Sequence, residues 1–323
     1  MRSFTFAATA ALALGAQSAL AGAIISNPSN PPHTSENGQY GYNDCQNYPD
    51  SPSSKCQTIW INDVDDWCLW APPSKATIGD SERYEVGWCT KAGHGTRLIP
   101  PGTLTGVHWQ WTEKFVQITG TGKFTNMNIP SGDEGGELDP HGADGNGNPI
   151  GGLVLSHIGG KTFQFKEWTQ FISDNEFCIR ACYDGPDAWK WCNHIYDVMG
   201  CYWNIPGNYQ SGQFEQSNAD LPAMPMGEYK RKDGSTSTWY QGVNPTPAGQ
   251  KPPKSSSIHY QKTITPASYS KARSSPTKAP TRHQAATTAK PTTKKTTTTK
   301  KKTTTTKKAT STHKAKRSHD ASA

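Results

Sequence analysis

The sequence predicts a mostly β fold: a single β-rich, disulfide-stapled domain with one or two short helices, followed by a disordered tail. Three observations lead to this prediction. Short apolar runs with the alternation of β-strands recur between residues 40 and 245, separated by Gly, Pro and Asp. All eight cysteines lie in that stretch. The composition then changes abruptly, and residues 250–323 contain 18 Thr and many Lys but few apolar residues.

Residues 1–21 have the pattern of a secretory signal peptide. A positive start precedes an apolar, Ala-rich run over residues 4–16, and residues 19–21 form a small-x-small cleavage site. The mature chain is therefore expected to begin at Gly22, or at Ile24 if the neighbouring site is used. Beyond residue 25 no apolar run approaches the roughly 18 residues that cross a bilayer, so no membrane span is expected. We expect a secreted protein, extracellular or associated with the cell wall.

The elements of the domain follow from the pattern of apolar residues. Residues 22–39 are rich in Ser, Asn and Pro, which predicts an extended leader. Residues 40–245 hold all 11 Trp and are long enough for one core. Strands are expected at residues 84–89, 107–111, 115–119, 153–158 and 177–183. Helical spacing predicts one helix over residues 188–199, ending at Gly200, and a second, shorter one over residues 165–172.

The cysteines predict four disulfides, because an even number in an exported chain is typical of a disulfide framework. They are Cys45, Cys56, Cys68, Cys89, Cys178, Cys182, Cys192 and Cys201. Four precede residue 90 and four follow residue 177, which favours pairing within each cluster but leaves the connectivity open. The alternative is a zinc site at Cys178, Cys182 and His194; an oxidising export route disfavours it.

The tail, residues 246–323, differs from the domain in charge. Residues 22–250 hold 14 basic and 25 acidic residues, whereas residues 251–323 hold 18 basic residues and one acid. Ser/Thr-rich sequence with Pro predicts an O-glycosylated stalk, and the positive charge is suited to anionic polymers. A solvated spacer is the alternative. Nucleic acid is disfavoured as a partner, because the chain is exported and no aromatic residue follows Tyr269 to stack on bases.

Oxygen-bearing side chains are most concentrated between residues 133 and 148. Asp139, Asp144, Asn146 and Asn148 are the candidate metal ligands. An EF-hand is excluded, because Pro149 stands where that loop needs Gly and the bidentate Glu is missing. We favour a cluster of turns with no cofactor, and keep calcium as the alternative.

No catalytic residue is assigned. The Gly-x-Ser-x-Gly elbow of serine hydrolases is absent, and no His has an Asp three residues before it. A carbohydrate-active hydrolase would need only two carboxylates at a suitable separation. The candidates for such a pair are Asp133, Glu134, Glu137, Asp139 and Asp144.

Two tryptophans are candidates for carbohydrate binding. Trp109 and Trp111 are two residues apart on a predicted strand, so their indoles project from the same face. Sugar rings stack on such indoles. The alternative is a core position, because large aromatic side chains dominate the burial in disulfide-rich domains.

Several longer motifs carry a family resemblance that spans about residues 39–230. The motifs occupy residues 39–45, 65–73, 95–100, 137–149 and 194–201. In these the chain resembles the secreted basidiomycete glycoproteins named macrophage activating glycoproteins. The resemblance implies a fungal, extracellular, glycosylated protein at the cell surface or wall, and it implies no enzyme mechanism. The Lys/Thr tail departs from the Ser/Thr endings more usual in that family.

Together these observations predict a secreted, non-enzymatic fungal glycoprotein of the cell wall or host interface that binds carbohydrate. The alternative is a secreted carbohydrate-active hydrolase with a carboxylate pair. The expected partners are cell-wall or host polysaccharide and, through the basic tail, anionic polymers.

Overall fold

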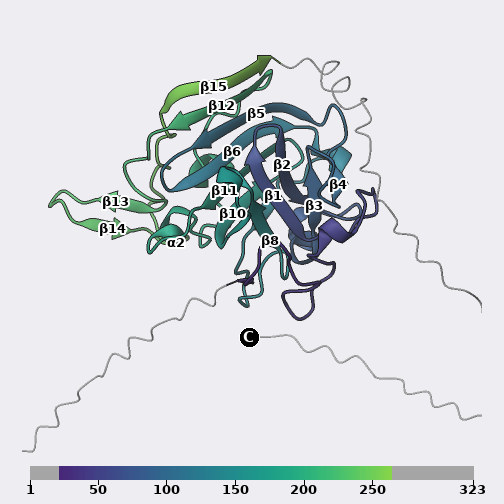
Figure 1. Cartoon of the computed structure of the whole chain (residues 1–323). Coiled ribbons are helices and arrows are strands. Elements are labelled where there is room, and N and C mark those ends of the chain that lie inside the picture. Colours follow the sequence, from purple (N-terminus) through teal and green to yellow (C-terminus); the bar gives the residue numbers. More distant parts are fainter. Residues whose placement is uncertain (1–21, 264–323) are drawn as a thin grey trace, which may run out of the picture. The chain divides into compact units, whose positions relative to one another are not determined.

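The computed structural model describes residues 22–263, which form two main β-sheets and a small hairpin (Figure 1). The six-stranded sheet, here the small sheet, has the order β4 (Arg97–Leu98), β3 (Val86–Cys89), β2 (Asp66–Ala71), β1 (Thr58–Asp63), β8 (Leu153–Ser156) and β9 (Phe163–Phe165). The seven-stranded sheet, here the large sheet, has the order β15 (Ser255–Thr263), β12 (Gln213–Ala219), β5 (Leu104–Trp111), β6 (Phe115–Gly122), β11 (Glu176–Cys182), β10 (Glu167–Ile172) and β7 (Gly136–Leu138).

The remaining elements are short. The hairpin consists of β13 (Glu228–Lys230) and β14 (Thr236–Thr238), which project away from the two sheets in Figure 1. The α-helices are α1 (Ile78–Ser81), α2 (Ala188–Trp191) and α3 (Gly200–Asn204). The 3-10 helices are η1 (Cys45–Asn47), η2 (Glu82–Tyr84), η3 (Phe124–Met127) and η4 (Ile158–Gly160). No helix of the described residues is long and apolar enough to cross a membrane.

The core lies between the two sheets. Alternate residues of each strand point inward, and the resulting apolar cluster includes Trp70 of β2 and Trp109 and Trp168 of β5 and β10. The rings of Trp70 and Trp168 meet across the sandwich with centroids 5.9 Å apart. Because each buried indole removes roughly 150–250 Å² from water, these contacts hold the sheets face to face.

The outer face of the large sheet is covered as well. Arg180 of β11 is buried there, and its guanidinium donates to the backbone oxygen of Trp191 at 3.1 Å and to Gln117 Oε1 at 2.8 Å. Thr119 Oγ1 donates to the Asn208 backbone oxygen at 2.6 Å. The segment from α2 to residue 210 therefore crosses this face, and polar strand residues supply its anchoring points.

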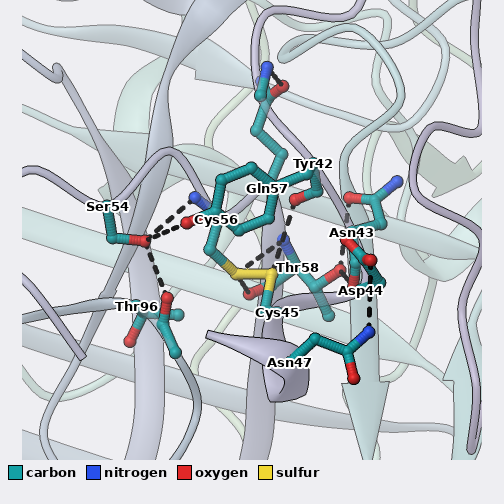
Figure 2. Close-up of a disulfide and its surroundings, with 12 residues drawn as sticks. Tyr42, Asn43, Asp44, Cys45, Asn47, Ser54, Cys56, Gln57, Thr58 and Thr96 are labelled. Carbon is teal, nitrogen blue, oxygen red and sulfur yellow. Dashed lines mark hydrogen bonds between the residues drawn. A yellow bond between two sulfur atoms is a disulfide. The ribbon is translucent and has the colours of Figure 1, made fainter. Parts of the chain in front are cut away.

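Four disulfides link the described residues, and they confirm pairing within each predicted cluster; Cys68–Cys89 joins the neighbouring strands β2 and β3. The pairs are Cys45–Cys56, Cys68–Cys89, Cys178–Cys201 and Cys182–Cys192. Figure 2 shows the first, where Thr58 Oγ1 also donates to the Asn43 backbone oxygen at 3.1 Å and attaches the N-terminal segment to β1. Cys178–Cys201 holds α3 against β11, and Cys182–Cys192 holds the end of α2 against the same strand.

The mostly β prediction is confirmed, and the five expected strands lie within or overlap β3, β5, β6, β8 and β11. The helix expected over residues 165–172 is wrong. That segment forms the end of β9 and all of β10, with Trp168 facing the core and Phe171 facing outward. The helix expected over residues 188–199 stops at Trp191, because Cys192 is bonded back to Cys182.

The segments predicted as leader and tail both contact the sheets. In the predicted leader, the Ile25 amide donates to Gln164 Oε1 at 3.0 Å and Gln164 Nε2 donates to the Ala23 backbone oxygen at 2.6 Å. The predicted tail starts at residue 246, yet β15 pairs antiparallel with β12 along the edge of the large sheet. The predicted signal peptide and the tail after Thr263 lie outside the described residues.

Candidate functional site: an acidic cavity

A cavity of about 750 Å³ lies against the outer face of the large sheet, beside β7 and β10. Residues 134–143, 171–176 and 194–201 form most of its wall. Six carboxylic acids line it: Glu82, Glu134, Glu137, Asp139, Glu176 and Asp197. No Lys or Arg of the described chain is among the lining residues. The cavity is therefore strongly acidic.

Strand pairing and a disulfide bring these groups together. Glu137 of β7 stands opposite Phe171 of β10, so its side chain projects from the outer face of the sheet. Phe171 packs against Cys201, and the Cys178–Cys201 disulfide holds α3 over that face. Asp197 lies in the loop just before α3. Residues about 60 positions apart in the sequence thus face one cavity.

Glu137 is one of the two most buried of the six acids, because its residue is 6% exposed and Asp139 is 4% exposed. Thr169 Oγ1 donates to its Oε1 at 2.7 Å. No N–H or hydroxyl group of the described residues donates to its Oε2. The Glu137 carboxyl is in hydrogen-bonding contact with the Asp197 carboxyl. Burial raises the pKa of Glu137 well above its ordinary value, and the charges of Asp139 and Asp197 raise it further. Two carboxyls in hydrogen-bonding contact require a shared proton.

Two histidines lie beside Asp139. Its Oδ1 accepts the backbone N–H groups of His141 at 2.7 Å and Gly142 at 2.8 Å, and His194 Nδ1 is 3.6 Å away. The His141 and His194 rings stack with centroids 4.2 Å apart, and His141 Nε2 lies 3.0 Å from Glu167 Oε2. Burial raises the pKa of Asp139, against the opposing charge of His194, and lowers the pKa of His194. The imidazoles therefore fix one wall of the cavity.

The wall also has an apolar rim. Ile195, Val198 and Tyr202 are exposed at the mouth or next to it, with 79% of Val198 and 62% of Tyr202 accessible. Tyr202 stacks on Tyr209 at 4.5 Å. Its hydroxyl interacts with Glu176, and burial together with that carboxylate raises the pKa of the phenol. Apolar surface thus borders the carboxyl groups.

The four candidate metal ligands have different surroundings. Asp139 and Asn148 line the cavity and face each other in an isolated β-bridge. The Arg83 guanidinium donates to Asp144 Oδ2 at 2.6 Å and Asn148 Oδ1 at 3.2 Å, and it lowers the pKa of Asp144 to about 2. Asn146 contributes its backbone N–H to Asp144 Oδ1 at 3.1 Å. Within residues 22–263, no group of three or more His, Cys, Asp or Glu is arranged to hold a metal ion.

The carboxylates considered for a hydrolase are divided in the same way. Glu134, Glu137 and Asp139 line the cavity. Asp133 instead accepts the Ile78 amide at 2.9 Å, at the start of α1. Sequence reasoning missed three cavity acids, Glu82, Glu176 and Asp197. The one sequence signal for Asp197 was its place in the motif over residues 194–201.

The tryptophan pair lies elsewhere. Trp109 and Trp111 do project from one face of β5, with ring centroids 5.9 Å apart, but that face points into the sandwich. Trp109 is 0% exposed, and Trp111 is half-buried against the core. The pair presents no stacking platform to solvent. Any saccharide site must therefore be sought elsewhere on the domain.

The fold and the site define a disulfide-stapled β-sandwich protein with an acidic cavity on the outer face of its large sheet. The chain belongs to the family of the appressorium proteins ROW1 and ROW2 of the basidiomycete fungus Mycosarcoma maydis. It is 53% identical to ROW2 over 233 residues, which cover 70% of this chain and 78% of ROW2. It is 49% identical to ROW1 over 230 residues, which cover 70% of this chain and 53% of ROW1.

The chain thus spans about half the length of ROW1. No family model matches the chain, and no solved structure matches it. Neither relative carries the name of the macrophage activating glycoproteins, so that resemblance stays a prediction.

Proposed function

We propose that this protein is exported and acts at the fungal cell wall or host interface by binding a saccharide in the acidic cavity, without catalysing a reaction. Two relatives are named for the appressorium, the structure with which a fungus enters its host. Four disulfides among the described residues support an oxidising, extracellular location. Glycosylation of the tail belongs to the same proposal.

The observation that carries the binding proposal is the combination of carboxyl groups and apolar surface at one cavity. Carboxylates such as Glu176 and Asp197 accept hydrogen bonds from sugar hydroxyls. The C–H faces of a sugar ring pack on apolar side chains such as Val198 and Tyr202. A concave site with a few convergent polar groups and perturbed pKa values is the usual form of a ligand site.

A carbohydrate-active hydrolase is the second candidate. The observation in its favour is Glu137, because burial raises the pKa of its carboxyl well above the ordinary value, and a general acid needs such a raised pKa. Against it, Glu137 and Asp197 are in hydrogen-bonding contact, which is closer than the roughly 5–5.5 Å that retaining enzymes keep between their two carboxyls. Binding is therefore placed before hydrolysis.

The test is cosedimentation of the full mature chain with insoluble chitin, β-glucan and mannan, with assay of released sugar in the same tubes. We expect retention on at least one polymer, no sugar release, and weaker retention of Asp197→Asn. Glu113→Gln is the matched control, because Glu113 is exposed in the β5–β6 turn, outside the cavity lining. All variants keep the basic tail, so differences in retention between the variants do not come from the tail.

Each other outcome of this test is decisive. Release of sugar, abolished by Glu137→Gln, would favour the hydrolase. Equal retention of Asp197→Asn and Glu113→Gln would remove the cavity from the binding proposal. The absence of retention on every polymer would overturn saccharide binding itself.

A further inference from the structure

We propose that the acidic cavity binds a saccharide carrying free amino groups, an oligomer of glucosamine units, with an ammonium group seated between Glu137 and Asp197. This inference rests on the proposed function and specifies its ligand. Three observations support it: the charge of the wall, the contact between the Glu137 and Asp197 carboxyls, and the apolar rim beside them.

The basic side chains of the wall do not balance its acids: His194 lines the cavity, and burial lowers the pKa of its imidazole. Six carboxylic acids line the cavity, and no Lys or Arg of the described chain does. Arg83, close to Gly142, is already bonded to Asp144, the Gly147 backbone oxygen and Asn148. Like charges gathered in a partly buried site repel one another, and a bound cation removes that repulsion. A neutral saccharide would leave the repulsion in place, and an anionic one would increase it.

The contact between Glu137 and Asp197 gives the cation a position. Glu137 Oε2 is buried, it belongs to a cavity-lining residue, and it receives no N–H or hydroxyl donor from residues 22–263. Without a ligand the two carboxyls need a shared proton to lie in contact, and an ammonium group can take the place of that proton. An ammonium group has three N–H donors and no acceptor, so it can serve Glu137 Oε2 and the neighbouring Asp197 carboxyl together.

The cavity is shaped for an organic cation rather than a bare ion. About 750 Å³ lies within the usual range of small-molecule sites, roughly 300–1,000 Å³. Inorganic metal is disfavoured, because no group of three or more metal-ligating side chains occurs in the described part of the chain. The exposed Val198 and Tyr202 offer apolar surface to the ring of a sugar, which a simple polyamine would not use.

The experiment compares two oligosaccharides of equal length by isothermal titration calorimetry on the full mature chain. One is the tetramer of glucosamine and the other the tetramer of N-acetylglucosamine, in which acetylation removes the positive charge. We expect the glucosamine tetramer to bind at least tenfold more tightly at pH 6, with an affinity that falls as salt is added. Spermine, a polyamine without sugar rings, is expected to bind more weakly than the glucosamine tetramer.

Two near-isosteric variants locate the ammonium site. Glu137→Gln and Asp197→Asn are each expected to weaken the glucosamine tetramer at least tenfold, and Glu113→Gln is the control that leaves it unchanged. Thermal unfolding checks that each variant is folded. Asp197 is exposed, so its variant keeps the test valid if the buried Glu137→Gln fails to fold.

The outcomes separate this inference from the proposed function. Equal binding of both tetramers would overturn the amino-sugar inference and leave saccharide binding standing. Binding of neither tetramer would overturn both, if polymer retention is absent too. Spermine binding as tight as the glucosamine tetramer would overturn the saccharide part and leave a site for amines. Unchanged affinity in both cavity variants would place the ligand elsewhere.

Discussion

The side-chain amide of Gln170, on the large sheet, hydrogen-bonds both backbone groups of Trp70, on the small sheet. Gln170 Oε1 accepts the Trp70 N–H at 2.9 Å, and Gln170 Nε2 donates to the Trp70 carbonyl oxygen at 3.0 Å. Where β1 pairs with β2, Ile61 stands opposite Trp67 and Asp63 stands opposite Asp66. Trp70 lies farther along β2 than these paired positions. The Gln170 side chain, from the opposite sheet, thus makes the backbone hydrogen bonds that a neighbouring strand would otherwise make with Trp70.

Replacing Gln170 by Leu should leave two buried backbone groups without partners. At roughly 1–3 kcal/mol for each, we expect a loss of about 3 kcal/mol in the free energy of unfolding. Urea unfolding measures it. Gln164→Leu is the matched control, because that amide binds only the leader, at Ala23 and Ile25, and should cost less. If both variants lose the same free energy of unfolding, the hydrogen bonds to Trp70 contribute no more to stability than those to the leader.

Glu85 predicts a pH-dependent stability. Its side chain is fully buried; burial raises its pKa to about 8, the charges of Glu82 and Asp133 add to this, and the hydrogen bond from Ser81 opposes it. Between its ordinary pKa of 4.5 and about 8, the folded state keeps a proton that the unfolded state has released. The contribution of Glu85 to the free energy of unfolding should therefore be greatest below pH 4.5. It should fall by up to about 1.4 kcal/mol per pH unit as the pH rises to about 8.

The variant Glu85→Gln should lose this decline, because its side chain does not ionise. Urea unfolding at pH 5 and pH 8.5 compares it with the native chain, and Glu113→Gln provides a control for an exposed acid. If the native chain and Glu85→Gln lose the same stability between the two pH values, the buried carboxyl is not the cause.

The two disulfides Cys68–Cys89 and Cys178–Cys201 close loops of similar length, with sequence separations of 21 and 23 residues. Removing either by double Cys→Ser substitution should therefore cost a similar amount, about 3 kcal/mol. Their effects on the cavity should differ. Only the second holds α3 over β10 and β11, so only its removal should speed amide hydrogen exchange in residues 194–201. Equal exchange in both variants would contradict this role.

Arg180 and Gln117 form a buried pair. We expect substitution of Gln117 to lower the free energy of unfolding more than substitution of Arg180. Burial lowers the pKa of Arg180 to about 9, and Gln117 Oε1 accepts from both Nε and Nη2. Gln117→Leu should cost about 3 kcal/mol or more, because it leaves a buried cation with fewer acceptors. Arg180→Met removes the charge itself and should cost less. Thermal and urea unfolding of the two variants rank them, and the reverse order would contradict the prediction.

Local pattern was enough to predict β3, β5, β6, β8 and β11 and the clustering of the disulfides. Val107 to Trp111 alternates, and its two indoles do share a face, but which face meets the core depends on packing between sheets. The same limit applies to residues 165–172, where aromatic residues at positions 165, 168 and 171 also fit a helix. The cavity was beyond reach, because Glu82, Glu137 and Asp197 meet only through strand register and the Cys178–Cys201 bond.

In the loop between Asp139 and Pro149, the Arg83 guanidinium supplies positive charge to the oxygen-bearing side chains of Asp144 and Asn148. Gly142, with φ at +58°, admits Arg83 so closely that a Cβ there would lie 2.9 Å from Nη1. A bound metal obeys mass action and leaves as its concentration falls outside the cell. The Arg83 guanidinium is part of the chain, so its concentration at the loop does not change when the solution is diluted. The conformation of this loop should therefore be unaffected by chelators.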